Sequence, residues 1–274
     1  MKINEKYLTR KAKDLRISIL DSIFKCGKGH IGGAYSIVEI LVTLYYGEFL
    51  RFNAKYPCWA DRDRFILSKG HAGVSLYCIL ADLGFFSKDE LLKLNSGGLL
   101  GEHPDHNIPG IECVTGSLGH GLSIGAGMAL ADIINGTKKK NIVLLGDGEC
   151  YEGSIWESMI FANNHKLYNL CAIVDRNKLI THGSTEKINK LEPFIDKWNA
   201  FGWKCIEINA HSFNEIHNAF SEFYETQSGS PTVIIANSIK GKGISFMEGQ
   251  ASWHHGAIKE DEYQKGRIEI LGGS

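Results

Sequence analysis

Five short apolar runs, separated by helix-like stretches, constrain the fold of this 274-residue chain more than any other feature. The runs cover residues 65–67, 142–145, 170–174, 205–208 and 233–235. Several of them lack polar alternation, as expected for strands that are covered on both faces. Alternating strands and helices predict βαβ units, and therefore an α/β fold with helices on both faces of a parallel sheet. The sequence has no repeat and no linker, so we expect a single domain over residues 1–274.

Helix starts are marked by a recurring Ser-x-x-Glu pattern, which is typical of a capping box. The pattern occurs at Ser36/Glu39, Ser87/Glu90, Ser154/Glu157 and Ser212/Glu215. Each pair opens a helix-like stretch, and apolar residues follow the first one at the spacing of one helix face. We therefore expect a capped helix after each pair, including one over residues 154–167.

Composition limits the class of function. The chain is 43% hydrophobic and 22% charged with a formal net charge of −1, which gives no general attraction to nucleic acid or to an anionic membrane. No apolar stretch approaches the roughly 20 residues that a membrane-spanning helix needs, and the charged N-terminus does not look like a secretion signal. The seven cysteines form no CxxC pair, so we expect free thiols and a cytoplasmic protein.

Polar side chains follow two successive predicted strands at the point where each strand ends. Gly146-Asp147-Gly148-Glu149 comes after run 142–145, and Asp175-Arg176-Asn177 comes after run 170–174. Neighbouring strands lie about 4.8 Å apart, so both side chains can reach one small cation. Oxygen ligands with room for phosphate oxygens are typical of magnesium bound with a polyphosphate. A simple Asp-Gly turn is the alternative for Asp147 alone, and the pairing with Asn177 favours a site.

A second glycine-rich segment runs from Thr115 to Gly121 and leads into a helix-like stretch. Free backbone N–H groups and the positive end of a helix suit an anion. Gly121, Gly125 and Ala129 are four residues apart, so close packing of this helix is the alternative explanation. A dinucleotide-binding fingerprint fails because Ile124 stands where its third glycine is needed, and residues 240–243 lack the spacing and the hydroxyl of a Walker loop.

Five histidines lie in loops marked by glycine or proline rather than on apolar faces. Their contexts are Gly-His-Ile-Gly-Gly at 29–33, Ser-Lys-Gly-His at 68–71, Gly-Glu-His-Pro-Asp at 101–105 and Trp-His-His-Gly at 253–256. Imidazoles titrate near neutral pH and can donate or accept protons, so a pocket that they line suits proton transfer at hydroxyl groups.

In its motifs and their order, the chain resembles the N-terminal, diphosphate-binding region of the transketolases. Gly-Asp-Gly followed by a distant Asn resembles the thiamine diphosphate signature, and the resemblance extends from the Gly-His pair at 29–30 to the His-Gly pair at 255–256. It implies the thiamine diphosphate-binding fold. It also implies transfer of a two-carbon ketol unit from a ketose donor to an aldose acceptor, with sugars or sugar phosphates as substrates.

The resemblance also implies roles for individual residues. Mg²⁺, or Ca²⁺ or Mn²⁺ in its place, is expected at Asp147, Asn177 and the carbonyl of Leu179. Catalytic contacts with the sugar are expected from His30, His103 and His255. Glu152 and Glu157 match acidic residues at the family's subunit interface. Thiamine diphosphate is expected to contact His71, Gly116, Ser117, Leu118, Gly148, Glu149, Asn177 and His255.

Two departures from the family pattern indicate that the chain works with a second subunit. Gly-His-Ile-Gly-Gly replaces the Gly-His-Pro of many full-length members and is associated with two-chain members. In the family, the glutamate that activates the aminopyrimidine ring and the pocket for that ring lie in the domain that follows this region. We therefore expect a separate C-terminal subunit that carries the pyrimidine-binding domain, in an α2β2 heterotetramer.

Three alternatives stay open. One is a subunit of another thiamine diphosphate enzyme, of the 2-oxo-acid dehydrogenase or deoxyxylulose-phosphate synthase type, although Ser-Lys-Gly-His is not expected in the dehydrogenases. Another is a non-catalytic subunit for cofactor binding or assembly, with histidines that have lost their role. The most distant is a NAD-dependent dehydrogenase, whose fingerprint is missing.

Overall fold

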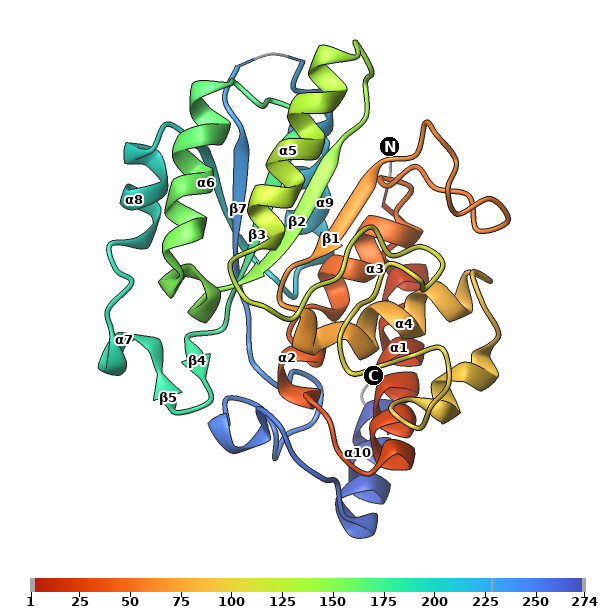
Figure 1. Ribbon diagram of the computed structural model, residues 1–274. Helices are drawn as coiled ribbons and strands as arrows, with labels where there is room; N and C mark the ends of the chain where they lie inside the picture. Colours follow the sequence, from red (N-terminus) through yellow and green to blue (C-terminus); the bar gives the residue numbers. More distant parts are fainter. Residues whose placement is uncertain (1–2, 228, 273–274) are drawn as a thin grey trace.

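All five apolar runs are strands of one sheet in the computed structural model, which describes residues 3–227 and 229–272. The strand order is β1-β2-β3-β7-β6, and every neighbouring pair is parallel (Figure 1). The predicted parallel sheet is therefore confirmed. The strands are β1 (Arg64–Leu67), β2 (Asn141–Gly146), β3 (Leu170–Arg176), β6 (Lys204–Asn209) and β7 (Thr232–Asn237).

Helices cover both faces of the sheet, and each face has its own core. Strand side chains alternate between the two cores: Ile142 and Leu144 enter one, and Val143 and Leu145 enter the other. This double burial explains why the run has no polar alternation. One core includes α1 (Glu5–Cys26), α2 (Ile31–Tyr35), α3 (Val38–Tyr46), α4 (Gly73–Asp82), α9 (Phe213–Glu225) and α10 (Glu260–Gly272); the other includes α5 (Gly121–Ile134), α6 (Gly153–Asn164) and α8 (Phe194–Ala200).

Helix α5 approaches the sheet closely at its glycines. A Cβ added to Gly125 would lie 2.4 Å from Val143 Cγ2, and one added to Gly121 would lie 2.3 Å from Ser68 Oγ. The small residues that the sequence shows in this segment are thus required by close packing, which brings the start of α5 next to the end of β1. None of the helices described combines the length and the apolar character that crossing a membrane requires.

Only one of the four predicted capping boxes caps an α-helix through the predicted residue. Ser212 caps α9 by accepting from Glu215 N (3.3 Å). Ser87 caps a short 3₁₀ helix, η2 (Lys88–Lys93), through Asp89 N rather than Glu90 N.

Ser36 and Ser154 cap nothing, so those two predictions are wrong. Their hydroxyls donate to Asp175 Oδ2 (2.7 Å) and to Gly119 O (2.9 Å), which lie in or beside the candidate site. The helices themselves begin nearby, at Val38 and Gly153.

Short elements gather beyond the carboxyl ends of the strands, at the lower edge of the sheet in Figure 1. They include the hairpin β4 (Leu179–Ile180) and β5 (Gly183–Ser184), the helix α7 (Thr185–Ile188), and the 3₁₀ helices η1 (Gly70–Ala72), η3 (Gly148–Tyr151) and η4 (Ala251–Trp253). Ligands of parallel sheets bind at this edge.

Candidate functional site

A cleft of about 230 Å³ opens beyond the carboxyl ends of β2 and β3. It contains oxygen donors from the strand tips together with two lysines and two histidines. The lining residues are Gly33, Lys69, His71, Leu118, Gly146, Asp147, Gly148, Glu149, Tyr151, Asn177, Leu179, Ile180, Thr181, Lys240 and His254.

Asp147 lies at the tip of β2 and is almost fully buried. Its carboxylate accepts from Gly148 N (2.7 Å) and Lys178 N (2.6 Å), and Arg176 Nη1 lies 3.2 Å away. Burial raises the pKa of Asp147, and the neighbouring Asp175 carboxylate raises it further. A carboxylate has about four acceptor positions, so this one keeps capacity for a cation that would relieve the cost of its buried charge.

Asn177 comes next to Asp147 because Gly146 pairs with Asp175 in the register of β2 and β3. Its amide is fixed at both ends: Nδ2 donates to Asp175 Oδ2 (3.0 Å) and Oδ1 accepts from Leu179 N (3.0 Å). Asp175 and the Leu179 N–H together fix the orientation of this amide. The arrangement brings together the three predicted metal ligands, Asp147, Asn177 and Leu179, at one cleft.

Two buried lysines contact oxygen atoms of these same segments. Lys69 Nζ donates to Asp175 Oδ2 and to Gly33 O (2.9 Å), and Lys240 Nζ donates to Leu179 O (3.0 Å). Burial and the nearby Lys69 lower the pKa of Lys240 to about 8. Two confined ammonium groups beside oxygen ligands can accommodate a cation together with a polyanion.

The loop before α5 is held against the tip of β2 by Glu149. The Glu149 carboxylate accepts from Ser68 Oγ (2.5 Å), Gly119 N (2.9 Å) and Gly146 N (3.1 Å). Glu149 therefore positions the loop that carries Leu118. Gly148 is required by space as well, since an added Cβ would lie 2.4 Å from Ile180 Cγ2.

Four histidines form a cluster beside the cleft. The His30 ring centroid lies 5.3 Å from that of His71, 5.4 Å from that of His254 and 4.4 Å from that of His255. Burial lowers the pKa of His30 to about 4, with His255 adding to the effect, and burial together with Lys240 lowers that of His254 to about 3. These two imidazoles are neutral at neutral pH and can accept a hydrogen bond from a hydroxyl group.

The remaining predicted residues do not line the cleft. His103 packs against Gly116, where an added Cβ would lie 2.8 Å from the imidazole Cδ2. Ser117 is exposed, and Glu152 and Glu157 are exposed at the start of α6 and along it.

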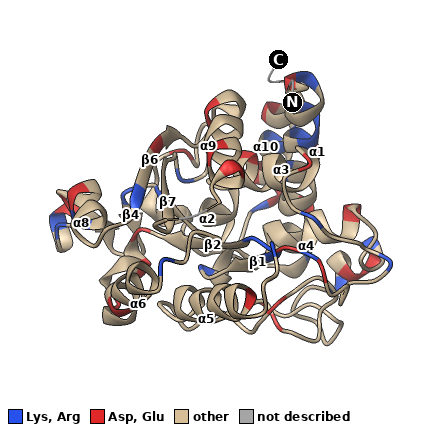
Figure 2. Ribbon diagram, turned by 90° about the horizontal axis from the view of Figure 1, so that it is seen from above, with Lys and Arg blue, Asp and Glu red and all other residues tan. Residues whose placement is uncertain are grey.

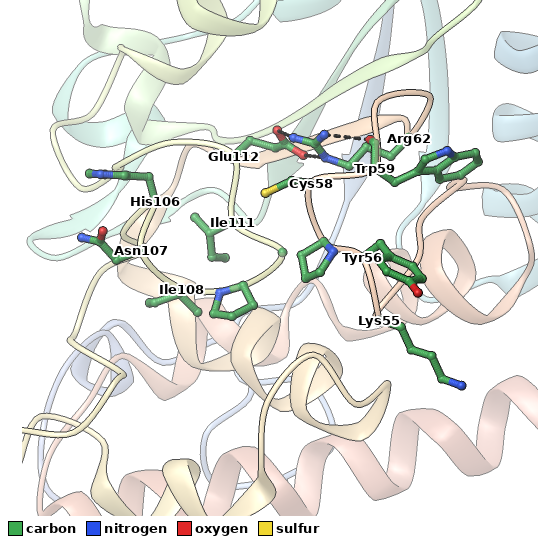
Figure 3. Close-up of a pocket in the computed structure, with 13 residues that line it drawn as sticks. Lys55, Tyr56, Cys58, Trp59, Arg62, His106, Asn107, Ile108, Ile111 and Glu112 are labelled. Carbon is green, nitrogen blue, oxygen red and sulfur yellow. Dashed lines mark hydrogen bonds and ion pairs between the residues drawn. The ribbon is translucent and has the colours of Figure 1, made fainter.

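A cavity larger than this cleft, about 700 Å³, lies elsewhere, between segments 55–62 and 106–112 (Figure 3). Its strongest charges are paired with each other, because Arg62 Nη2 and Nε donate to the Glu112 carboxylate at 2.7 and 2.8 Å. It contains none of the predicted site residues. We therefore assign the chemistry to the smaller cleft, where unlike charges converge.

Sequence reasoning missed the roles of Lys69, Asp175 and Lys240. Lys240 comes shortly after β7, just as Asp147 and Asn177 come after β2 and β3, so inspecting every strand end would have identified it. Asp175 has no comparable signal, because its role depends on contacts with Ser36, Lys69 and Ser238 from distant segments.

Comparison with known proteins agrees with this geometry. Residues 8–272 match the family model described as "Transketolase, thiamine diphosphate binding domain". The chain is 41% identical to a subunit of the apulose-4-phosphate transketolase of Phocaeicola vulgatus, over 93% of this chain and 90% of the relative. It is also 41% identical to "6-deoxy-6-sulfo-D-fructose transketolase subunit SqwG" of Clostridium sp., over 96% of each.

Full-length transketolases match over only part of their length. Human transketolase is 37% identical over 89% of this chain, which spans 38% of the human protein. The crystal structure of the Campylobacter jejuni transketolase superposes with a TM-score of 0.91 at 30% identity, covering 99% of this chain and 43% of that protein.

Acidic and amide oxygens at neighbouring strand tips, opposed by lysines, are thus part of a thiamine diphosphate-binding domain. Within that class, the chain belongs to the transketolase family.

Proposed function

We propose that this chain is the cofactor-binding subunit of a two-chain transketolase, which moves a two-carbon ketol unit from a ketose to an aldose. The observation that carries the proposal is the cleft at the tips of β2 and β3, where Asp147, Asn177 and Leu179 face Lys69 and Lys240. The names of the relatives that match over nearly their full length, both transketolase subunits, support the same assignment.

The side chains of the cleft fit thiamine diphosphate with a divalent ion. Asp147, Asn177 Oδ1 and the Leu179 carbonyl are hard oxygen ligands suited to Mg²⁺, with Ca²⁺ or Mn²⁺ as substitutes. Lys69 and Lys240 offer ammonium groups to the diphosphate. Further contacts are proposed for His71, Gly116, Ser117, Leu118, Gly148, Glu149, Asn177 and His255. When bound, the cofactor supplies the carbanion chemistry that breaks and forms the carbon–carbon bond.

The histidines next to the cleft orient the sugar and move its protons. His30 is neutral at working pH because burial lowers its pKa to about 4, so it accepts a hydrogen bond from a sugar hydroxyl rather than storing a proton. His103 and His255 complete the wall of the substrate channel in this proposal. The partial burial of His30 and His255 keeps the imidazoles ordered while leaving room for a sugar.

The proposal includes a separate C-terminal subunit that supplies the pyrimidine-binding domain and its activating glutamate, in an α2β2 assembly. Helices α5 and α6 carry one charged residue each, and Figure 2 shows them almost free of charge. Ile160 and Phe161 are exposed there, at 58% and 39%. An outer face with few charges and exposed apolar side chains is suited to burial against another protein chain. We treat residues 1–274 as one domain because both cores share one sheet.

We also place the protein in the cytoplasm. All seven cysteines are free, and Cys78, Cys150 and Cys171 are buried as thiols. Free thiols of this number are typical of a reducing compartment.

Reconstitution tests the proposal. The purified chain is assayed with thiamine diphosphate, Mg²⁺ and a panel of ketose donors and aldehyde acceptors, alone and with a candidate pyrimidine-domain subunit. We expect ketol transfer only with both chains, because the activating glutamate is proposed to lie on the partner. Pyruvate serves as the control donor for 2-oxo-acid chemistry. Robust transfer by the single chain would contradict the two-chain assignment, and turnover of pyruvate alone would contradict the reaction.

A further inference from the structure

Three side chains from separate loops bring atoms of metal-ligand type together beside the cleft. His30 Nδ1 lies 3.2 Å from Glu102 Oε1, and His255 Nε2 lies 3.5 Å from the same oxygen. The three ligand atoms all lie within 4.8 Å of one another. Glu102 belongs to none of the contacts assigned above to the cofactor or to magnesium.

The two separations from Glu102 are close to those of a tetrahedral zinc site. Ligands about 2.0–2.2 Å from Zn²⁺ lie roughly 3.4 Å from one another at tetrahedral angles. The two measured distances fall on either side of that value. His30 Nδ1 is buried and makes no hydrogen bond of good geometry, so the contact with Glu102 leaves this nitrogen unsatisfied. A buried imidazole nitrogen normally has a partner, and a metal ion would provide one.

The backbone holds the three groups in place without an ion. Gly29 and Gly256 form an antiparallel bridge, with N–H···O distances of 3.0 and 3.1 Å, and His30 and His255 flank it. The Glu102 carbonyl packs against Gly73 at the start of α4, where an added Cβ would lie 3.2 Å from the oxygen. Little rearrangement is needed for metal binding, because both supports come from the fold.

We propose that His30, Glu102 and His255 form a binding site for a divalent transition-metal ion of the zinc class. Two imidazoles and one carboxylate suit Zn²⁺, whereas Mg²⁺ prefers ligand sets made of oxygen alone. The site is therefore distinct in chemistry from the one at Asp147 and Asn177. The side chains of Glu102 and His255 are 38% and 37% exposed, so an ion can enter from solvent and keep an open position.

A metal ion bound at this site would affect catalysis, and this consequence rests on the proposed function. His30 and His255 are two of the imidazoles assigned to the sugar hydroxyls, and a bound ion takes up the nitrogens that face Glu102 and fills the space between them. Zinc therefore inhibits ketol transfer, and a chelator restores it.

Metal binding is measured on the full chain after chelator treatment, without thiamine diphosphate or a partner. Co²⁺ serves as a spectroscopic probe and Zn²⁺ is titrated by calorimetry. We expect visible cobalt bands of a low-coordinate nitrogen and oxygen site, without the thiolate-to-cobalt band that any of the seven cysteines would produce. Glu102→Ala and His255→Ala should each weaken Zn²⁺ binding at least about tenfold.

Two control variants match these changes. His106→Ala alters an exposed histidine that lies 3.6 Å from Asp105, and Cys58→Ser removes the exposed thiol. Both should keep the wild-type Zn²⁺ affinity. Circular dichroism confirms that each variant is folded.

Unchanged Zn²⁺ affinity in Glu102→Ala and His255→Ala, or a cobalt spectrum with thiolate ligands, would overturn the site. Because these measurements need neither cofactor nor substrate, their result is independent of whether the chain takes part in ketol transfer. In the reconstituted enzyme, Zn²⁺ should inhibit the wild type at concentrations that leave the residual activity of Glu102→Ala unaffected. Equal inhibition of both would overturn the regulatory role.

Discussion

At Asp147, burial disfavours the charged carboxylate, whereas its hydrogen-bond and ion-pair partners favour it. The carboxylate is almost fully buried beside Asp175, which raises its pKa, while two backbone N–H donors and Arg176 stabilise the charged form. Functional sites commonly contain such perturbed groups, because a ligand resolves the conflict. Here the ligand is the divalent ion that we propose to carry the diphosphate.

Asp147→Ala removes that charge, so Mg²⁺-dependent binding of thiamine diphosphate should weaken by about a hundredfold or more. The melting temperature should change little, because a costly buried carboxylate is also removed. Calorimetry at fixed Mg²⁺ concentration measures the affinity, and Asp89→Ala, at an exposed position of η2, is the control. Wild-type affinity in Asp147→Ala would refute the metal assignment.

The sequence predicted the residues of the cleft more completely than their contacts. Asp147 and Asn177 could be predicted because each lies within three residues of the end of an apolar run, and strand ends converge at one edge of a parallel sheet. The orientation of the Asn177 amide could not be predicted, because it depends on Asp175, which in turn is held by Ser36 and Ser238. No local pattern encodes contacts between such distant segments.

Among the elements, α3 shows how a local pattern can mislead. Ser36 and Glu39 fit a capping box, yet α3 begins at Val38 and Glu39 forms an ion pair with Arg16 of α1 instead (2.7 Å). His211, from the loop before α9, lies 3.0 Å from the same carboxylate. Glu39 pairs with the buried arginine rather than capping the helix, because an unpaired buried charge costs more free energy than a missing cap.

Glu39→Gln should therefore destabilise the fold by about 3 kcal/mol at neutral pH, since Arg16 would be left buried without its counter-charge. Burial alone would raise the pKa of Glu39, but Arg16 and His211 lower it to about 2. The carboxylate thus stabilises the fold above the unfolded-state pKa of about 4.3, and this contribution is lost as pH falls toward 2.

Urea unfolding of wild type and Glu39→Gln across this pH range measures the effect. The difference in the free energy of unfolding should be constant above about pH 5 and should shrink between about pH 4.3 and pH 2. A difference that does not depend on pH would indicate lost packing rather than a lost ion pair.

For the molecule as a whole, the parallel sheet and its helical layers were predictable because hydrophobic periodicity records burial directly. The exposed outer face of α5 and α6 could not be predicted, because it depends on which helix faces the rest of the chain leaves uncovered. Ile134, Ile160 and Phe161 stay exposed on these helices, at 74%, 58% and 39%.

If this face joins two copies of the chain, Phe161→Glu should weaken self-association about tenfold or more, because it places a charge in an apolar contact. Sedimentation velocity over a range of concentrations measures the dissociation constant. Ile268→Glu is the matched control, since Ile268 is 71% exposed on α10. The same dissociation constant for both variants would exclude α5 and α6 as the contact.

The bridge between Gly29 and Gly256 also bears on how the protein is made. It joins a residue near the start of the chain to one near its end, and the imidazoles beside the cleft come from both segments. During synthesis on the ribosome, the sheet can assemble as its strands emerge, but the histidine cluster forms only after residue 256 has left the exit tunnel. Proteolytic loss of the segment after residue 250 would remove His254 and His255 from the cluster while sparing all five strands.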